Sequence, residues 1–198
     1  DPSSMRTTAI EDNNHFILNG NKTWISNSPI ADVFVVWAKH DGKVKGFVLD
    51  RGMEGLSTPK IEGKLSLRTS VTGMINLDDV KVPKENRIGD NGFGFTFAMK
   101  TLSGGRIGIA AQALGIASGA YELALKYSRE RRAFGKEISK HQAIAFKLAD
   151  MATEIDASRL LCLKYAWLKD NEHNYDRAGA MAKVFASEVA MKTTIEAV

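Results

Sequence analysis

The sequence predicts an α+β multidomain protein: a small antiparallel β-barrel or β-sandwich domain followed by part of an antiparallel four-helix bundle. Short apolar runs punctuated by Gly, Asn, Asp and Pro fill the first part of the chain, as in a small all-β domain. From Gly92 onward there is no proline, and apolar residues recur at helical spacing. Proline, charge and glycine cluster between Pro83 and Asn91. We therefore predict one domain over residues 1–88 and a second over residues 89–198.

The first domain is predicted from its strand signals. Residues 15–26 (HFILNGNKTWIS) are two apolar runs around Asn19-Gly20, a strong signal for a β-hairpin. Residues 32–39 contain an apolar run long enough for a strand that is buried on both faces. Asp41-Gly42 then turns the chain into a strand at residues 44–49. Residues 57–61 and 73–82 supply further strands.

The second domain is predicted as three long helices. Each has a stripe of residues at helical spacing. In the first helix a set of glycines lies beside the stripe, and because each costs a helix about 1 kcal/mol against alanine, we expect another backbone or a ligand to approach them closely. We expect the third helix, which starts near Tyr175, to be cut short at Val198, since no stop signal precedes that residue. The stripes are Ile107, Ala111, Leu114, Ser118, Tyr121 and Leu125, with Gly108, Gly115 and Gly119 beside them; Ile144, Leu148, Met151, Ile155, Cys162 and Ala166; and Ala180, Val184, Ser187 and Met191.

Composition limits the classes of function. The chain has 198 residues, 44% hydrophobic and 25% charged, the profile of an ordinary soluble globular protein. Residues 1–90 are neutral overall, so the net charge of +4 falls on residues 91–198. That bias suits an anionic ligand such as a nucleotide and is too weak to predict a nucleic-acid partner. No apolar run approaches the roughly 20 residues of a membrane span, so none is predicted.

The cysteine count and a search for common catalytic motifs mainly exclude kinds of site. The single cysteine, Cys162, cannot form an internal disulfide, which fits a reducing compartment, and we expect an inert buried thiol. Histidines and cysteine do not cluster at metal-ligand spacing, so no metal is predicted. The Gly-x-Ser-x-Gly motif is absent, and Gly135-Lys136 lacks the surroundings of a phosphate loop.

One candidate binding segment is Trp24 to Ser26. On a strand, residues two apart lie on one face, so Trp24 and Ser26 would offer an apolar wall and a hydroxyl donor to a planar ring. The alternative is an ordinary strand with a packed tryptophan.

A second candidate segment runs from Arg129 to Gly135 and is followed by His141-Gln142. Three arginines beside an aromatic residue at a helix end can neutralise a diphosphate and cover an adenine ring. The alternative is a solvated helix C-terminus, where basic residues are favoured by the helix dipole.

Six segments of the chain, including these two, resemble the acyl-CoA dehydrogenase family in the same order. Each match alone is weak evidence for the family, but six in sequence over nearly the whole chain are specific evidence for it. They are residues 1–3 (DPS), like the end of its Gly-Ser-Asp loop; 19–27 (NGNKTWISN), like its flavin-facing hairpin; 63–72 (GKLSLRTSVT) and 77–83 (LDDVKVP), like its middle-domain strands; 105–115 (GRIGIAAQALG), like its central helix; and 130–135 (ERRAFG) with His141-Gln142, like the signature before the next helix.

The resemblance implies the domain roles and the cofactor. Residues 1–88 would be an N-terminally truncated middle β-domain, and residues 89–198 a C-terminally truncated helical bundle. The family's N-terminal helical domain would be missing from this chain. The family is usually a homotetramer that binds FAD at a subunit interface, and so FAD is the expected cofactor.

The resemblance also implies site residues. Trp24 would lie at the flavin edge in the segment that includes Ile25, and the hydroxyl of Ser26 would bond near the reactive flavin nitrogen. The diphosphate and adenosine end of FAD from a neighbouring subunit would meet Arg131, Phe134 and Gln142. Ala133 stands where a threonine donor is common in the family, so one phosphate contact is in doubt.

Substrate contacts follow in the same way. Arg106 would help to hold CoA. Ser103 replaces an aspartate often found three residues before that arginine, which puts one pantetheine contact in doubt. In most family members the glutamate base lies far beyond the position of Val198, and in a minority it comes one residue before the arginine, where this chain has Gly105. No catalytic residue is therefore predicted within the chain.

Residues 1–88 look most like glutaryl-CoA dehydrogenases, and residues 92–198 like short-chain or butyryl-CoA dehydrogenases. The implied function is FAD-dependent α,β-dehydrogenation of a short-chain acyl-CoA, within fatty acid or amino acid catabolism. An electron-transferring flavoprotein would accept the electrons, in a bacterial cytoplasm or a mitochondrial matrix. The alternatives are an acyl-CoA oxidase-type flavoprotein and a non-catalytic fragment.

Overall fold

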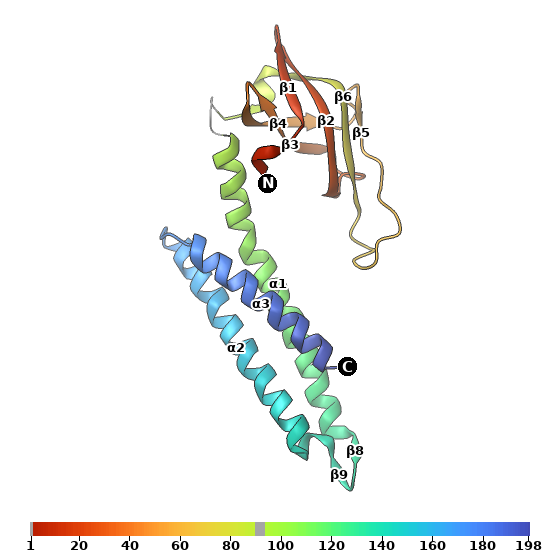
Figure 1. The fold of residues 1–198 in the computed structure, drawn as a ribbon, viewed down its shortest axis with the longest axis vertical. Coiled ribbons are helices and arrows are strands. Elements are labelled where there is room, and N and C mark those ends of the chain that lie inside the picture. The colour runs from red at the N-terminus through yellow and green to blue at the C-terminus, as the bar shows by residue number, and fades with distance from the viewer. Residues whose placement is uncertain (1, 90–93) are drawn as a thin grey trace. The chain divides into compact units, whose positions relative to one another are not determined.

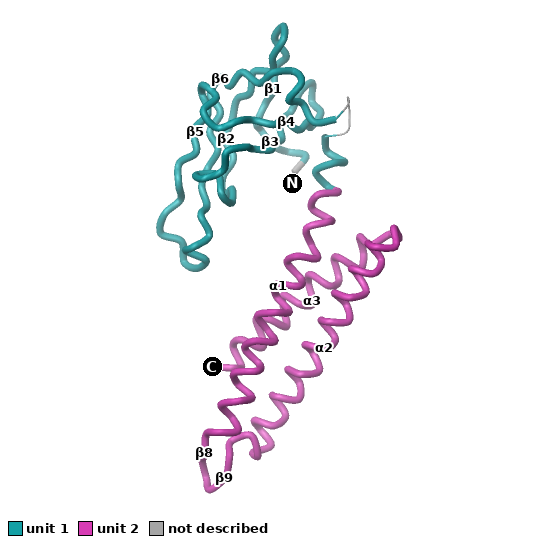
Figure 2. The backbone as a smooth tube through the Cα atoms, turned by 180° about the vertical axis from the view of Figure 1, so that it is seen from behind, with its two compact units in different colours: residues 1–99 teal, residues 100–198 magenta. Residues whose placement is uncertain are grey.

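The computed structural model describes residues 2–89 and 94–198, and the chain divides into two compact units, residues 1–99 and 100–198 (Figure 2). The first unit holds the seven-stranded sheet and the start of the first long helix. The second holds the rest of that helix and two more. The predicted boundary at residues 88 and 89 adjoins residues 90–93, which lie outside the described residues.

The first unit is built on one seven-stranded sheet (Figure 1). Its order is β5-β6-β2-β1-β3-β4-β7, and the pairs are antiparallel except β1 with β3, which is parallel. The fold is thus the expected β-domain, with a mixed sheet in place of a purely antiparallel one. The strands are β1 (Thr8–Asp12), β2 (His15–Ser26), β3 (Val33–His40), β4 (Lys43–Asp50), β5 (Leu56–Ser57), β6 (Thr72–Pro83) and β7 (Arg87–Ile88), with 3-10 turns η1 (Pro2–Ser4) and η2 (Lys84–Asn86).

The hairpin predicted at Asn19-Gly20 is wrong, because β2 runs unbroken through it. The turn lies earlier, between Asp12 and its partner His15. Gly20 has φ 135°, and a Cβ there would come 2.9 Å from the Cα of Thr7. Only glycine can adopt this conformation and leave room for the backbone of Thr7. Gly20 therefore allows two backbone segments to lie close together inside the sheet, and the Asn-Gly pair does not form a turn.

The β2–β6 ladder contains two bulges that cancel. Asn19 faces two residues of β6, and its side chain bonds both to the Asp79 carboxylate (2.8 Å) and to the Asp79 amide (2.9 Å). Further along, Thr23 and Trp24 face one residue of β6. Because one extra residue stands on each strand, the ladder returns to its starting register.

The core of the first unit lies on one face of β3. In β3, buried and exposed residues alternate, with Phe34 and Val36 inside and Val33 and Val35 outside. The prediction that this strand is buried on both faces is therefore wrong for the described chain. The core is Ala9, Phe16, Leu18, Phe34, Val36, Ala38, Phe47, Leu49, Ile75, Leu77, Val80 and Val82.

The segment between β5 and β6 is largely a loop. The strand predicted at residues 57–61 is limited to β5 and an isolated bridge between Lys60 and Gly73, whereas the strand predicted at residues 73–82 is confirmed as β6. Residues 63–71, which resembled a family strand, form no strand. The Lys64 ammonium fixes the loop by donating to the carbonyls of Leu67 (2.8 Å) and Ser70 and to the Thr72 hydroxyl (3.0 Å).

The second unit is helical, as predicted. The helices are α1 (Gly94–Glu130), α2 (Gln142–Asp170) and α3 (Asp176–Glu196), and successive helices run in opposite directions (Figure 1). A short hairpin of β8 (Arg132–Ala133) and β9 (Lys136–Glu137), with η3 (Ile138–Lys140), joins α1 to α2. The core is made of small side chains around one tyrosine: Ala110, Ala113, Ala117, Ile155, Cys162, Tyr165, Ala182, Ala186, Val189 and Ala190.

The predicted stripes fit α2 well and the other helices less well. Leu148, Met151, Ile155 and Cys162 are buried as expected, and burial raises the pKa of the Cys162 thiol, which fits an inert group. In α3 the expected stripe lies mostly outward, with Val184 and Met191 exposed. The predicted close approach to the glycines of α1 has no counterpart within the described chain, because a Cβ at Gly108, Gly115 or Gly119 would meet nothing within 4 Å.

Length and composition alone would allow α1 to cross a membrane. This is weak evidence, since helices of soluble bundles pass the same test. Ala110, Ala113 and Ala117 bury one face of α1 in the helical core, as in a bundle helix.

Candidate functional site

Two exposed aromatic residues have strained backbones. Trp24 and Phe134 have φ of 61° and 51°, and their exposed fractions are 65% and 96%. A left-handed conformation costs a bulky residue roughly 1–3 kcal/mol, and such strain clusters at ligand sites. The bulge of β2 and the hairpin between α1 and α2 are therefore the two places where a binding function is best sought.

The bulge turns Trp24 away from the core. Along β2, Phe16 and Leu18 point inward, so strict alternation would direct residues 22, 24 and 26 inward as well. With the extra residue, Ile25 pairs with Gly73 and packs against the core instead. The prediction that Trp24 and Ser26 share a face by simple alternation does not apply across a bulge. Both side chains are nevertheless exposed, whereas that of Ile25 is half-buried.

The segment after Trp24 is held firmly. The Asn27 amide donates to the Val71 carbonyl (2.8 Å), and Ser28, which is buried, donates its hydroxyl to the Ile25 carbonyl (3.2 Å). Arg51 reaches across to donate to the carbonyls of Ala31 (2.6 Å) and Ser28 (3.0 Å). These bonds keep the exposed Trp24–Ser26 surface in one conformation.

Lys22 lies just before the bulge and is half-buried, with Nζ 3.9 Å from the sulfur of Met5. Burial lowers the pKa of this ammonium group, because the charged form loses solvation. No pattern in the sequence indicated this burial.

The second strained aromatic stands at the tip of the β8–β9 hairpin. Phe134 and Gly135 both have positive φ, as the two central residues of a type I′ turn require. Arg131 directly follows α1, and its carbonyl accepts from the Ile138 amide (2.9 Å). Gln142 opens α2 and is exposed. Arg131 and Phe134 therefore lie on the short connection between α1 and α2, and Gln142 lies at its end.

Two side chains of the candidate segment that were given no individual role hold this hairpin. Arg132 donates to the carbonyl of Gly135 (3.1 Å), and a ring nitrogen of His141 lies 3.1 Å from the carbonyl of Ala133. The His141 ring also meets Phe134 edge-on, with ring centroids 6.0 Å apart. His141 is the N-cap residue of α2, yet its side chain makes no bond to the helix end. It supports the strained turn instead.

Ser103 and Arg106 lie on one turn of α1, and both are half-buried. Residues three apart are neighbours on a helix surface, so the two share a face. The carbonyl of Ser103 accepts a hydrogen bond from the hydroxyl of Tyr165.

The residues at the bulge and the hairpin suit the two ends of FAD. Trp24 offers a flat apolar surface and Ser26 a hydroxyl, the groups that a planar heteroaromatic ring requires. Arg131, Phe134 and Gln142 offer a cation, an aromatic face and an amide, which suit a diphosphate and an adenosine. The chemistry of both sets fits the cofactor.

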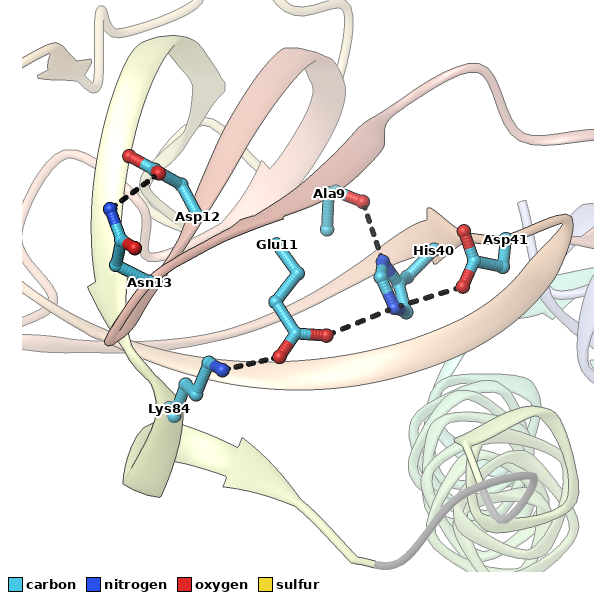
Figure 3. Close-up of polar contacts among 7 residues, drawn as sticks. All are labelled: Ala9, Glu11, Asp12, Asn13, His40, Asp41 and Lys84. Atoms are coloured by element: carbon cyan, nitrogen blue, oxygen red, sulfur yellow. Dashed lines mark hydrogen bonds and ion pairs between the residues drawn. The ribbon is translucent and has the colours of Figure 1, made fainter.

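A polar cluster at the ends of β1 and β3 was not anticipated (Figure 3). The carboxylate of Glu11 pairs with Lys84 and lies 3.7 Å from His40 Nε2, which is also 3.2 Å from Asp41. His40 Nδ1 donates to the Ala9 carbonyl (3.1 Å). Because β1 and β3 are paired in register only at Thr8 and Lys39, the cluster joins the two strands where their ladder ends. It is best explained as structural.

The cluster predicts a pH dependence of stability. The hydrogen bond from Lys84, and then its charge, hold the pKa of Glu11 below its ordinary value of 4.5. A folded-state pKa that is depressed contributes stability above the unfolded-state pKa, and this is lost as pH falls through the folded-state value. We expect Glu11→Gln to lower the urea midpoint slightly at about pH 7, with the difference from wild type shrinking as the pH falls below 4.5 and through the lower folded-state pKa.

The matched control is Asp12→Asn on the same strand, whose carboxylate accepts from the neighbouring Asn13. A Glu11→Gln difference that stayed constant down to about pH 3 would contradict an ionic origin.

Comparison with known proteins identifies the family to which the chain belongs. The family models and relatives that match the chain place it among the flavoprotein oxidoreductases. More narrowly, the chain belongs to the acyl-CoA dehydrogenase family. Its residues 1–80 match the acyl-CoA dehydrogenase middle domain, and its residues 92–198 match the acyl-CoA dehydrogenase C-terminal domain.

Individual relatives agree with the family. The structure of butyryl-CoA dehydrogenase from Megasphaera elsdenii is 44% identical with a TM-score of 0.95, covering 100% of this chain and 53% of that one. A glutaryl-CoA dehydrogenase from Mycobacterium smegmatis in complex with FADH2 is 34% identical, with a TM-score of 0.95, covering 100% and 51%. The caffeyl-CoA reductase–Etf complex subunit CarC of Acetobacterium woodii is 44% identical, covering 100% and 54%. This chain therefore spans about half the length of these relatives.

Proposed function

We propose that the full-length protein carrying this chain is an FAD-dependent acyl-CoA dehydrogenase that acts on a short-chain acyl-CoA of the butyryl or glutaryl type. The observation that carries the proposal is the pair of strained, exposed aromatic residues, Trp24 and Phe134. Each stands among groups that suit one end of FAD, and the chain belongs to a family whose relatives include a dehydrogenase crystallised with FADH2.

In this proposal each residue has a definite task. Trp24 covers one edge of the flavin, the hydroxyl of Ser26 donates a hydrogen bond near its reactive nitrogen, and the segment through Ile25 supplies main-chain contacts. Arg131 neutralises the diphosphate, while Phe134 and Gln142 contact the adenosine end. Arg106 and Ser103 bind the CoA part of the substrate. FAD, when bound, would accept the β-hydrogen of the acyl chain as hydride.

The chain's own contribution to the reaction is binding and orientation. A rigid surface holds its groups in place before the substrate arrives, so that less orientational freedom is lost in the transition state. The position before Arg106, where some family members carry the base, is Gly105. We therefore propose that a carboxylate outside these 198 residues removes the α-proton. Assembly as a homotetramer and electron transfer to an electron-transferring flavoprotein belong to the same proposal.

An absorbance experiment tests this function. We expect the purified full-length protein to show the visible flavin band, and anaerobic addition of butyryl-CoA or glutaryl-CoA to bleach it. Bleaching by only one of them identifies the substrate. A colourless protein that also fails to bind added FAD would overturn the proposal and favour the non-catalytic alternative. Bleaching followed by rapid peroxide formation in air would favour the oxidase alternative.

The relatives suggest a second candidate, the reverse reaction. One is named as a subunit of a caffeyl-CoA reductase–Etf complex, and another, from Clostridium sporogenes, as a 3-(aryl)acrylate reductase, at 44% identity. In that case the protein would reduce the α,β double bond of an unsaturated acyl-CoA. The chemically reduced protein would then be reoxidised faster by caffeyl-CoA than the oxidised protein is bleached by butyryl-CoA.

A further inference from the structure

The turn of α1 that carries Arg106 is intrinsically weak. Gly104 and Gly105 precede the arginine, and each glycine inside a helix costs about 1 kcal/mol against alanine because the unfolded chain is freer. α1 continues through this turn, but the two glycines make it less stable than its neighbours. A contact from outside α1 would therefore help to keep Arg106 in one position.

Tyr165 of α2 reaches this turn. Its hydroxyl donates to the carbonyl of Ser103, and the hydroxyl oxygen itself accepts a hydrogen bond from the backbone amide of Ile107. Ser103 and Ile107 are the two partners of one i, i+4 step of the helix, and Gly104, Gly105 and Arg106 lie between them. The hydroxyl thus bridges both ends of the segment that contains the glycine pair.

The tyrosine is itself fixed from the other side. It is fully buried, and its ring lies over Gly179 of α3, where a Cβ would come 2.9 Å from Cζ. The Tyr175 ring packs beside it at 5.6 Å between centroids. Burial raises the pKa of the Tyr165 hydroxyl, so that it remains a donor, and the charge of Arg106 is close enough to act against that rise.

We propose that Tyr165 is a positioning residue for CoA: its hydroxyl clamps the Ser103–Ile107 turn and so holds Arg106 in the orientation that binds CoA. The proposal rests on the role of Arg106 in the proposed function. It assigns a binding task to a buried side chain that does not touch the ligand.

The test compares Tyr165→Phe with wild type in the full-length protein. Isothermal titration with CoA itself should give a Kd about five- to tenfold higher in the variant, and KM for butyryl-CoA should rise by a similar factor with kcat within about twofold. The truncated substrate S-butyryl-N-acetylcysteamine, which lacks most of CoA, should show no such change. Ser158→Ala is the matched control, because it removes a buried hydroxyl in α2 that bonds only within its own helix, to the Glu154 carbonyl at 2.8 Å.

Two further variants separate positioning from loss of stability. In the Arg106→Ala background, Tyr165→Phe should change the CoA Kd by less than about twofold, since both act through one contact. Gly179→Ala, which suits a helix but displaces the Tyr165 ring, should weaken CoA binding as Tyr165→Phe does.

The outcomes are distinguishable. Equal CoA affinity in wild type and Tyr165→Phe overturns the positioning role, and so does an equal loss with the truncated substrate. A wild-type protein that binds CoA without oxidising any acyl-CoA sinks the proposed function, while the two Kd values still decide the role of Tyr165. A wild-type protein that does not bind CoA overturns both.

Discussion

Arg131→Ala is expected to weaken FAD binding by about 10- to 100-fold. Arg131 follows the last residue of α1, and its side chain is exposed beside the strained Phe134 hairpin. A charge-assisted hydrogen bond is worth about 1.5–3 kcal/mol, which corresponds to that range of affinity. The measurement is the flavin content of the full-length protein after extended dialysis, followed by titration of the apoprotein with FAD.

The matched control is Arg129→Ala, an exposed arginine in the last turn of α1 that belongs to the same basic segment but to which the proposed function assigns no contact with FAD. It removes the same charge without removing the proposed contact, so its flavin content should stay close to wild type. Full retention of flavin in Arg131→Ala, or an equal loss in both variants, would contradict a specific diphosphate contact and would indicate only a general effect of charge.

Phe47→Ala should destabilise the β-unit by about 3–5 kcal/mol, a large share of the stability of a domain of this size. Phe47 is fully buried on β4, and its ring meets that of Phe16 edge-on at 5.1 Å between centroids. Removing the ring leaves a cavity in the core that strands β2 and β4 share. Urea unfolding of the 198-residue chain, followed by tryptophan fluorescence, measures the change.

Val35→Ala is the comparison variant, since Val35 lies on the outward face of the neighbouring β3 with 55% of its surface exposed. Its cost should stay below about 1 kcal/mol. A similar cost in both variants would show that the outward face of β3 is as well protected from solvent as the core, in conflict with the alternating burial of β3.

Much of the fold was predictable because its signals are local. The strands at β4 and β6, the three helices and the buried face of α2 follow from apolar periodicity and from the position of glycine and proline. The errors arose where one signal has two physical causes. Asn19-Gly20 is as suitable for a close contact inside a sheet as for a turn. In α3 the large apolar residues Val184 and Met191 point outward, because Ala182 and Ala186 permit the closer helix packing.

The candidate site was predicted in part. Resemblance selected Trp24 and Phe134, but neither residue type signals a left-handed backbone, so the strain at both became visible only in the structure. The contacts that support the site residues could not be predicted from the sequence either. Tyr165 and Ser103 are 62 residues apart in the chain, and helical periodicity does not reveal which buried tyrosine meets which carbonyl. One clue to the β6 bulge was present: the core residues Leu77 and Val80 are three apart, which breaks strict alternation.

The two bulges of the β2–β6 ladder have an evolutionary consequence. Because Lys22 pairs with Ile75 and Ile25 with Gly73, shortening β2 by the single residue Trp24 leaves both pairs, and the core behind them, as they are. The exposed ring of Trp24 is therefore not needed for the pairing of β2 with β6 or for the core. A change of one codon is enough to give such a strand an aromatic contact surface or to remove it, so a lineage can gain or lose this surface without first having to evolve a new β-domain.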